Sequence, residues 1–346
     1  MTGTFDRKLA RLLLEACRFT YAEGAGGTKN KNDGDDSHSY LTTHAGETIT
    51  GKLESSLTIL GDGAGRTSKA CVFVFADRNV VSYMGTEVEF DLLHNPQQTF
   101  LSFQDWVQDG KARPVPFTLD GSHIGKAAGV ILKGKVHHGF LEELRFVQSR
   151  IVEHLAASGG IGKPVVVTGH SQGAGETALA IPALTAAGYS VESTYMFAPP
   201  RAGNDDFVES VNDLCPSIHR IEFGDDVVPH LPPLAIRAAL ESALIDHPFL
   251  KTAFTAQLNK VHDFGYVALG RLTYGHQDEH KVHISMSQED EAALFLKRLM
   301  WMSKSPKNWG DHHHLAGTTA DTSATPPRRG NYTAIVSPEP EGWPSV

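Results

Sequence analysis

Short β-branched apolar runs alternate along the chain with longer stretches whose apolar residues recur every three or four positions. The short runs predict strands, and the spacing of three and four predicts helices. The predicted strands are Ala70–Ala76, Asn79–Tyr83, Lys135–His138, Pro164–Thr168, Thr194–Phe197 and Ile218–Phe223. The predicted helices are Leu9–Phe19, Leu141–Ser158, Glu176–Ala187 and Gln288–Met302. Because strands alternate with helices, we expect an α/β fold with a mostly parallel central sheet flanked by helices.

Two apolar segments and a tail stand apart from this alternation. Residues 88–103 and 233–260 are rich in Leu, Ile and Phe, and we interpret them as lid-like insertions, the second helical. A packed surface loop and a core helix are the respective alternatives. Residues 317–346 contain five prolines with Ser, Thr and Gly, a composition typical of an extended or disordered segment. The sequence therefore predicts one domain over residues 1–316, followed by a Pro-rich tail.

Composition limits the classes of function. The chain has 346 residues, 40% of them apolar, which suffices for a large buried core. With 31 basic and 40 acidic residues the net charge is −9, so we expect no nucleic-acid partner and favour a neutral or apolar substrate. No apolar run reaches eighteen residues, which predicts no membrane span. No obligate protein partner is indicated.

The compartment is predicted from the cysteines and the first helix. Cys17, Cys71 and Cys215 form too sparse and odd a set for a disulfide framework and are compatible with a reducing compartment. The stretch Leu9–Phe19 is interrupted by charges at helical spacing and does not read as a signal sequence. We therefore expect a cytoplasmic location, with signal-independent secretion as the alternative.

The strongest candidate chemistry lies where a β-branched run meets an Ala-rich helix. There the chain reads Gly169-His170-Ser171-Gln172-Gly173. Gly-x-Ser-x-Gly between a strand and a helix is typical of a nucleophile elbow, whose tight turn exposes the serine hydroxyl at a helix N-terminus. A nucleophilic serine needs a base and an acid that orients the base. After a nucleophile elbow, both the acid and the base follow the serine along the chain. Asp226, just after the strand Ile218–Phe223, is well placed to be the acid.

Four separated blocks of the chain resemble the class 3, or fungal-type, lipases of the α/β-hydrolase superfamily. The blocks are Val136–Phe140, Gly169–Gly173, Phe197–Asn204 and Asp226–Pro232. The resemblance covers residues from about 70 to about 315. It implies an α/β-hydrolase fold, no cofactor and no metal, and the hydrolysis of carboxylic esters, typically acylglycerols. A triacylglycerol lipase or related carboxylic ester hydrolase would meet its lipid or ester substrate at an interface.

The resemblance also implies roles for individual residues. The backbone N–H groups of Thr86 and Gln172 would hold the oxyanion, Ser171 would be the nucleophile and Asp226 the acid. The family carries an Asp-His pair in a loop after a late helix, which matches Asp311-His312 and makes His312 the predicted base. His313 is the alternative, because three consecutive histidines leave the register open.

Other interpretations share parts of this pattern. A phospholipase or a short-chain esterase would use the same catalytic residues and differ in its substrate pockets. A non-catalytic lipid-binding relative would keep the fold without a histidine in reach of Ser171. The histidines His276, His280 and His283 have spacings compatible with a zinc site, but they lack a helical His-Glu-x-x-His arrangement, and a solvated loop is the favoured interpretation.

Overall fold

The computed structural model describes residues 4–25, 40–41, 51–60, 70–85, 113–231, 265–287, 290–291, 293–295, 297–298, 313, 315, 332–337 and 343–345. Both predicted insertions, 88–103 and 233–260, lie outside the described residues, as do Thr86 and His312.

A twisted central sheet organises the fold. Among the described residues it has eight strands in the order β1-β2-β3-β6-β7-β9-β11-β12. The inner strands β3, β6, β7, β9 and β11 are mutually parallel, whereas β1, β2 and β12 pair antiparallel at the two edges. Their bounds are β1 Leu53–Ile59, β2 Ala70–Phe75, β3 Asn79–Tyr83, β6 Val165–His170, β7 Val191–Phe197, β9 Ile218–Phe223, β11 Arg271–His276 and β12 Lys281–Ile284.

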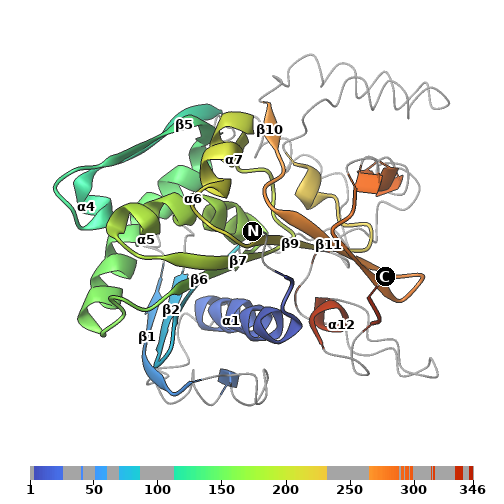
Figure 1. Ribbon diagram of the computed structural model, residues 1–346, viewed down its shortest axis with the longest axis horizontal. Helices are drawn as coiled ribbons and strands as arrows, with labels where there is room; N and C mark the ends of the chain where they lie inside the picture. Colours follow the sequence, from blue (N-terminus) through green and yellow to red (C-terminus); the bar gives the residue numbers. More distant parts are fainter. Residues whose placement is uncertain are drawn as a thin grey trace.

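Helices cover both faces of the sheet, as Figure 1 shows. The bounds of the helices on one face are α5 His138–Ala157, α6 Gln172–Ala187 and α7 Asp205–Asn212, and those on the other are α1 Arg7–Ala25 and α12 Tyr332–Val336. Two buried apolar clusters fill the layers, one between the sheet and α5, α6 and α7 and one between the sheet and α1 and α12. Because helices cover both faces of this parallel sheet, its inner strands are almost wholly buried.

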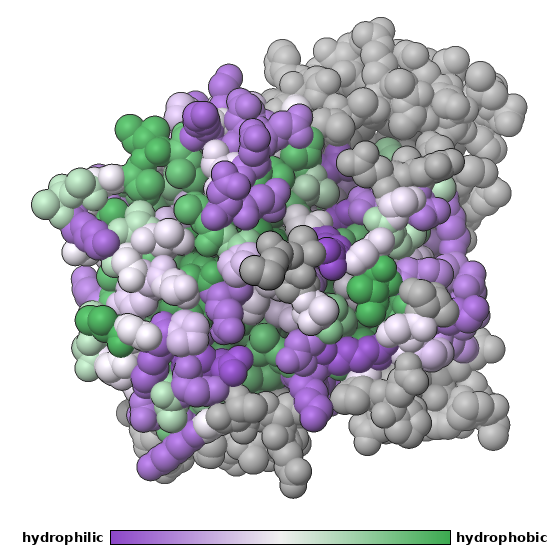
Figure 2. Space-filling model, in the orientation of Figure 1, coloured by the Kyte–Doolittle hydropathy of each residue, from purple (hydrophilic) through white to green (hydrophobic). Residues whose placement is uncertain are grey.

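A smaller sheet lies beside the α5 and α7 layer. Among the described residues it has four strands in the order β10-β8-β5-β4. Their bounds are β4 Pro114–Leu119, β5 Val130–His137, β8 Gly203–Asn204 and β10 Tyr266–Val267, and the short helix α4 Gly121–Ile124 follows β4. In Figure 2 hydrophilic side chains cover much of the described surface, and the most exposed large apolar side chains are Ile131, Ile161 and Leu60.

The predicted alternation of strands and helices agrees with the observed elements through the middle of the chain. The tail differs from its prediction. Residues Tyr332–Val336 form helix α12, and Tyr332, Ile335 and Val336 are buried in the apolar cluster beneath the sheet. Trp343 packs against the same cluster. The folded domain thus extends beyond residue 316, because these apolar side chains supply part of the core.

Candidate active site

The turn between β6 and α6 presents Ser171 at the carboxyl end of the sheet. Ser171 has φ of 55°, a left-handed conformation that costs a non-glycine residue energy and is typical of functional turns. Its N–H donates to the carbonyl of Phe197 in the neighbouring strand β7, at 3.0 Å. A Cβ on Gly169 would lie 2.4 Å from the carbonyl oxygen of Gly173, and one on Gly173 would lie 2.3 Å from that of Tyr83. The two glycines are therefore required by close backbone approach.

A single imidazole connects Ser171 with Asp226. Nε2 of His313 lies 2.8 Å from Oγ of Ser171, and Nδ1 lies 2.9 Å from Oδ2 of Asp226. With the proton on Nδ1, the ring donates to the carboxylate and accepts the serine hydroxyl proton. All three residues are buried, with exposures of 7% for Ser171, 5% for His313 and 0% for Asp226. This arrangement can activate a hydroxyl as a nucleophile.

The imidazole in contact with Ser171 was predicted to be that of His312. The structure places His313 there, and His312 lies outside the described residues. Neighbouring side chains point in different directions from the backbone, so only one of the consecutive histidines can lie between Ser171 and Asp226. The geometry therefore supports His313, the alternative candidate, as the base in place of His312.

The carboxylate of Asp226 has two donors besides His313. The N–H of Val228, in the turn η2 Val228–His230, donates to Oδ1 at 3.0 Å. The hydroxyl of Tyr332 in α12 donates to Oδ2 at 3.4 Å. Burial, reinforced by the charge of Asp226, raises the pKa of Tyr332 well above its ordinary value, so the hydroxyl keeps its proton. The sequence interpretation missed Tyr332, because it lies in the Pro-rich tail.

His170 supports the backbone of His313. Its Nε2 donates to the carbonyl oxygen of His313 at 2.7 Å, and its Nδ1 accepts from the hydroxyl of Tyr21 at 2.8 Å. Tyr21 belongs to the N-terminal helix α1. His170 and Tyr21 together therefore support the backbone of the catalytic imidazole, and no local motif pointed to Tyr21.

The N-terminus of α6 and the end of β3 meet beside Ser171. Gln172 is the first residue of α6, so its N–H is among the helix donors that have no acceptor within the helix. Gly85 precedes the predicted oxyanion residue Thr86, and a Cβ there would lie 3.1 Å from Cβ of Ser171. The segment leading into Thr86 therefore approaches Ser171 closely. Free N–H groups at this point can stabilise an oxyanion.

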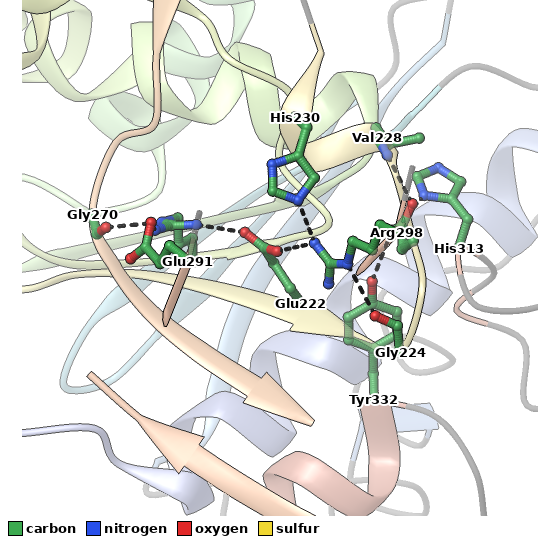
Figure 3. A network of polar contacts seen from close by, with 11 residues as sticks. Glu222, Gly224, Val228, His230, Gly270, Glu291, Arg298, His313 and Tyr332 are labelled. Atoms are coloured by element: carbon green, nitrogen blue, oxygen red, sulfur yellow. Dashed lines mark hydrogen bonds and ion pairs between the residues drawn. The ribbon is translucent and has the colours of Figure 1, made fainter. Parts of the chain in front are cut away.

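A buried charge network holds the loop that carries Asp226 (Figure 3). Arg298 is fully buried, and its Nη1 bonds to Oε2 of Glu222 and, at 2.8 Å, to Nε2 of His230. Its Nε donates to the carbonyl of Gly224 at 3.0 Å, just before Asp226 in the chain. Burial, with the charge of Arg298, lowers the pKa of His230 well below its ordinary value. The neutral imidazole can then accept from the guanidinium.

The histidines considered for zinc lie on the β11–β12 hairpin. Nε2 of His276 is 3.6 Å from the carboxylate of Glu279, and Nε2 of His283 is 4.0 Å from it. Within the part of the chain that the structure describes, no three His, Cys, Asp or Glu side chains are grouped to hold a metal ion.

Comparisons with known proteins agree with this geometry. The family described as Lipase (class 3) matches residues 80–236. The secreted mono- and diacylglycerol lipase 1 of Fusarium solani is 36% identical over 101 residues, and the match covers 29% of this chain and 30% of the length of that relative. The crystal structure of the mono- and diacylglycerol lipase from Aspergillus oryzae aligns over 79% of this chain and 80% of that chain, with 18% identity and a TM-score of 0.50.

The comparison corrects the predicted location. The Fusarium relative is by name a secreted protein, which points to an extracellular location, so the expectation of a cytoplasmic protein is wrong. Cys17, Cys71 and Cys215 are free and buried, and buried thiols of this kind pack as small apolar groups in any compartment. The number of cysteines was therefore no guide to the compartment of this protein. None of the described helices is long and apolar enough to span a membrane.

The family match, the fold and the geometry around Ser171 agree with one another. The match over residues 80–236 includes the Gly-x-Ser-x-Gly turn, and the mostly parallel sheet carries Ser171 at its carboxyl edge. Residues 80–236 match the class 3 lipase family, and the chain has the fold of a solved mono- and diacylglycerol lipase.

Proposed function

We propose that the chain is a serine ester hydrolase of lipase type that cleaves carboxylic esters of acylglycerols through an acyl-enzyme on Ser171. The observation that carries the proposal is the imidazole of His313 bonded to both Ser171 and Asp226. In the forward step Nε2 of His313 takes the hydroxyl proton while Oγ of Ser171 attacks the ester carbonyl carbon. The carboxylate of Asp226 orients the ring and stabilises its cationic form.

The oxyanion of the tetrahedral intermediate is held by backbone donors. We assign these to the N–H groups of Gln172 and Thr86, the first because it begins α6 and the second because Gly85 leads into it beside Ser171. When the intermediate collapses, the ester C–O bond breaks and the alcohol leaves with the proton from His313. Water then gives a proton to His313 and attacks the acyl-enzyme, which releases the carboxylic acid and regenerates Ser171.

The substrate class is proposed from the relatives. Both the Fusarium and the Aspergillus proteins are named as mono- and diacylglycerol lipases, and we infer that partial glycerides are substrates of this chain. A net charge of −9 agrees with uncharged lipids, since an acidic surface repels anionic ones. The substrate would be met at a lipid–water interface.

Hydrolysis of matched mono-, di- and triacylglycerols, a phospholipid and a short-chain ester by purified protein tests this proposal. We expect the highest turnover on the partial glycerides, and a loss of roughly three or more orders of magnitude in Ser171→Ala. Highest turnover on the phospholipid or the short-chain ester would show that partial glycerides are not the preferred substrates. Equal activity of Ser171→Ala and the unaltered protein would refute the mechanism.

A further inference from the structure

The N-terminal helix α1 helps to hold the backbone at two residues, His313, whose imidazole faces Ser171, and Leu315. The carbonyl of His313 is bonded by His170, which Tyr21 of α1 supports in turn. The carbonyl of Leu315 accepts two hydrogen bonds from Arg18 of α1, from Nε at 3.1 Å and from Nη2 at 2.8 Å. Helix α1 therefore bonds directly to the carbonyl of Leu315, and it supports the bond to the carbonyl of His313 through His170.

Arg18 also contacts the element that supports Asp226. Its Nη2 donates to Oγ1 of Thr333 at 2.9 Å. Thr333 follows Tyr332 in α12, and the hydroxyl of Tyr332 donates to Asp226. One guanidinium thus connects the backbone beside the base with the helix that supplies a donor to the acid.

The remaining contacts of Arg18 fix the orientation of its planar group. Nη1 donates to Oε1 of Glu15 at 2.7 Å, and the side chain of Glu15 is only 1% exposed. A guanidinium presents its donors in a rigid fork, so anchoring one edge on Glu15 directs the other edge toward Leu315 and Thr333. A lysine ammonium has no such fixed geometry and cannot reproduce the fork.

We propose that Arg18 is a positioning residue for the catalytic base, setting the place of His313 relative to Ser171 and Asp226 through the carbonyl of Leu315. The inference rests on the proposed function, in which His313 transfers the proton. Arg18 itself touches none of the three reacting side chains in this arrangement, so it acts through the backbone. The opposing explanation is that Arg18 only docks α1 onto the fold.

Arg11 offers a matched control for that opposing explanation. It lies on the same helix, pairs with the same Oε1 of Glu15 at 3.4 Å, and is 23% exposed where Arg18 is 20% exposed. Its Nη1 donates to Oγ of Ser337 at 2.8 Å, beyond the end of α12. Losing Arg11 therefore weakens the docking of α1, while the two bonds from Arg18 to the carbonyl of Leu315 remain.

The test compares Arg18→Leu, Arg18→Lys and Arg11→Leu with the unaltered protein on a soluble short-chain ester. We expect kcat of Arg18→Leu to fall about ten- to hundredfold with KM nearly unchanged, since a small misplacement of a catalytic group has this effect. The kcat of Arg18→Lys should lie between those of Arg18→Leu and the unaltered protein. Arg11→Leu should keep kcat within about twofold of the unaltered value. Urea denaturation of each variant ensures that kcat is compared on folded protein.

A proton spectrum gives a second readout that does not depend on turnover. The downfield resonance of the histidine proton bonded to Asp226 should be retained in Arg11→Leu and broadened or lost in Arg18→Leu. Equal kcat and equal spectra for the two leucine variants would overturn the inference while leaving the proposed function intact. If Arg18→Leu does not fold, unchanged kcat in Arg18→Lys would overturn it.

A failure of the proposed function would give a different result. In that case the unaltered protein hydrolyses no ester faster than Ser171→Ala does, and a role for Arg18 in catalysis falls with it. The spectra would then report only whether Arg18 orders the segment around His313.

Discussion

Replacing Arg298 by methionine should destabilise the protein strongly, because it breaks a buried charge network. Arg298 and Glu222 are both 0% exposed, and Glu222 retains only Arg220 among its ion-pair partners in the described structure when Arg298 is removed. Breaking a buried pair by removing one partner costs about 3 to 5 kcal/mol, since the other charge stays in the interior. The bond from Nε of Arg298 to the carbonyl of Gly224, near Asp226, is lost as well.

The pH dependence follows from Glu222. Burial raises the pKa of this carboxyl, but the charges of Arg298 and Arg220 outweigh burial and lower it to about 2 from an ordinary 4.5. A group whose pKa is depressed by folding contributes stability above its unfolded pKa, and the contribution is lost as pH falls through the folded pKa. The difference between Arg298→Met and the unaltered protein should therefore be full near neutrality and shrink between pH 4.5 and about 2.

Urea denaturation followed by tryptophan fluorescence measures this difference. The control is the double variant Glu222→Gln/Arg298→Met, which removes both charges of the pair and should recover at least about 1 kcal/mol of the loss. Ester turnover of the folded fraction reports on the Asp226 loop. A loss below about 1 kcal/mol in Arg298→Met, or no recovery in the double variant, would refute the buried-pair reasoning.

Three further predictions concern the turn, the buried histidines and metals. Gly173→Ala, whose Cβ would lie 2.3 Å from the carbonyl oxygen of Tyr83, should lower the unfolding midpoint far more than Gly159→Ala. At Gly159 the Cβ meets nothing within 4 Å, and the φ of 71° costs alanine only its left-handed backbone strain; equal midpoints would contradict the packing argument. Burial lowers the pKa of His137 to about 3 and of His219 to about 4, so stability should decline as pH falls from 6.5 through these values. In urea titrations at several pH values, His137→Gln should show a smaller decline of stability with falling pH. An unaltered dependence of stability on pH would contradict the role given to His137. Ester turnover should survive exhaustive chelation, whereas a loss reversed by zinc would revive the metal interpretation.

The inner strands β3, β6, β7 and β9 were predictable because both of their faces are buried, whereas the inner strand β11 was missed. Strand β9 coincides with the predicted Ile218–Phe223, and the β-branched run before Ser171 became β6. The edge strands β1 and β12 escaped prediction, since exposed or half-buried edges carry polar residues such as Glu54, Ser55 and Lys281. Apolar runs are thus a guide to the centre of such a sheet and a poor guide to its margins.

The site divides in a similar way between local and long-range determinants. Ser171 and Asp226 follow directly from short motifs at strand ends. The position of His313 does not, because it depends on contacts from segments far away in the chain. His170 bonds to the carbonyl of His313, and Arg18 bonds to the carbonyl of Leu315. Tyr332 was missed for the same reason, as five apolar and polar residues in a Pro-rich segment give no periodic signal.

The most direct test of the account is the ester turnover of His313→Ala compared with His312→Ala. If His313 is the base, its removal should lower kcat/KM by roughly three or more orders of magnitude, while His312→Ala should retain most of the activity. Because the two variants delete adjacent and identical side chains, general effects on the segment cancel in the comparison. Loss of turnover in His312→Ala with activity preserved in His313→Ala would contradict the arrangement of Ser171, His313 and Asp226 described above.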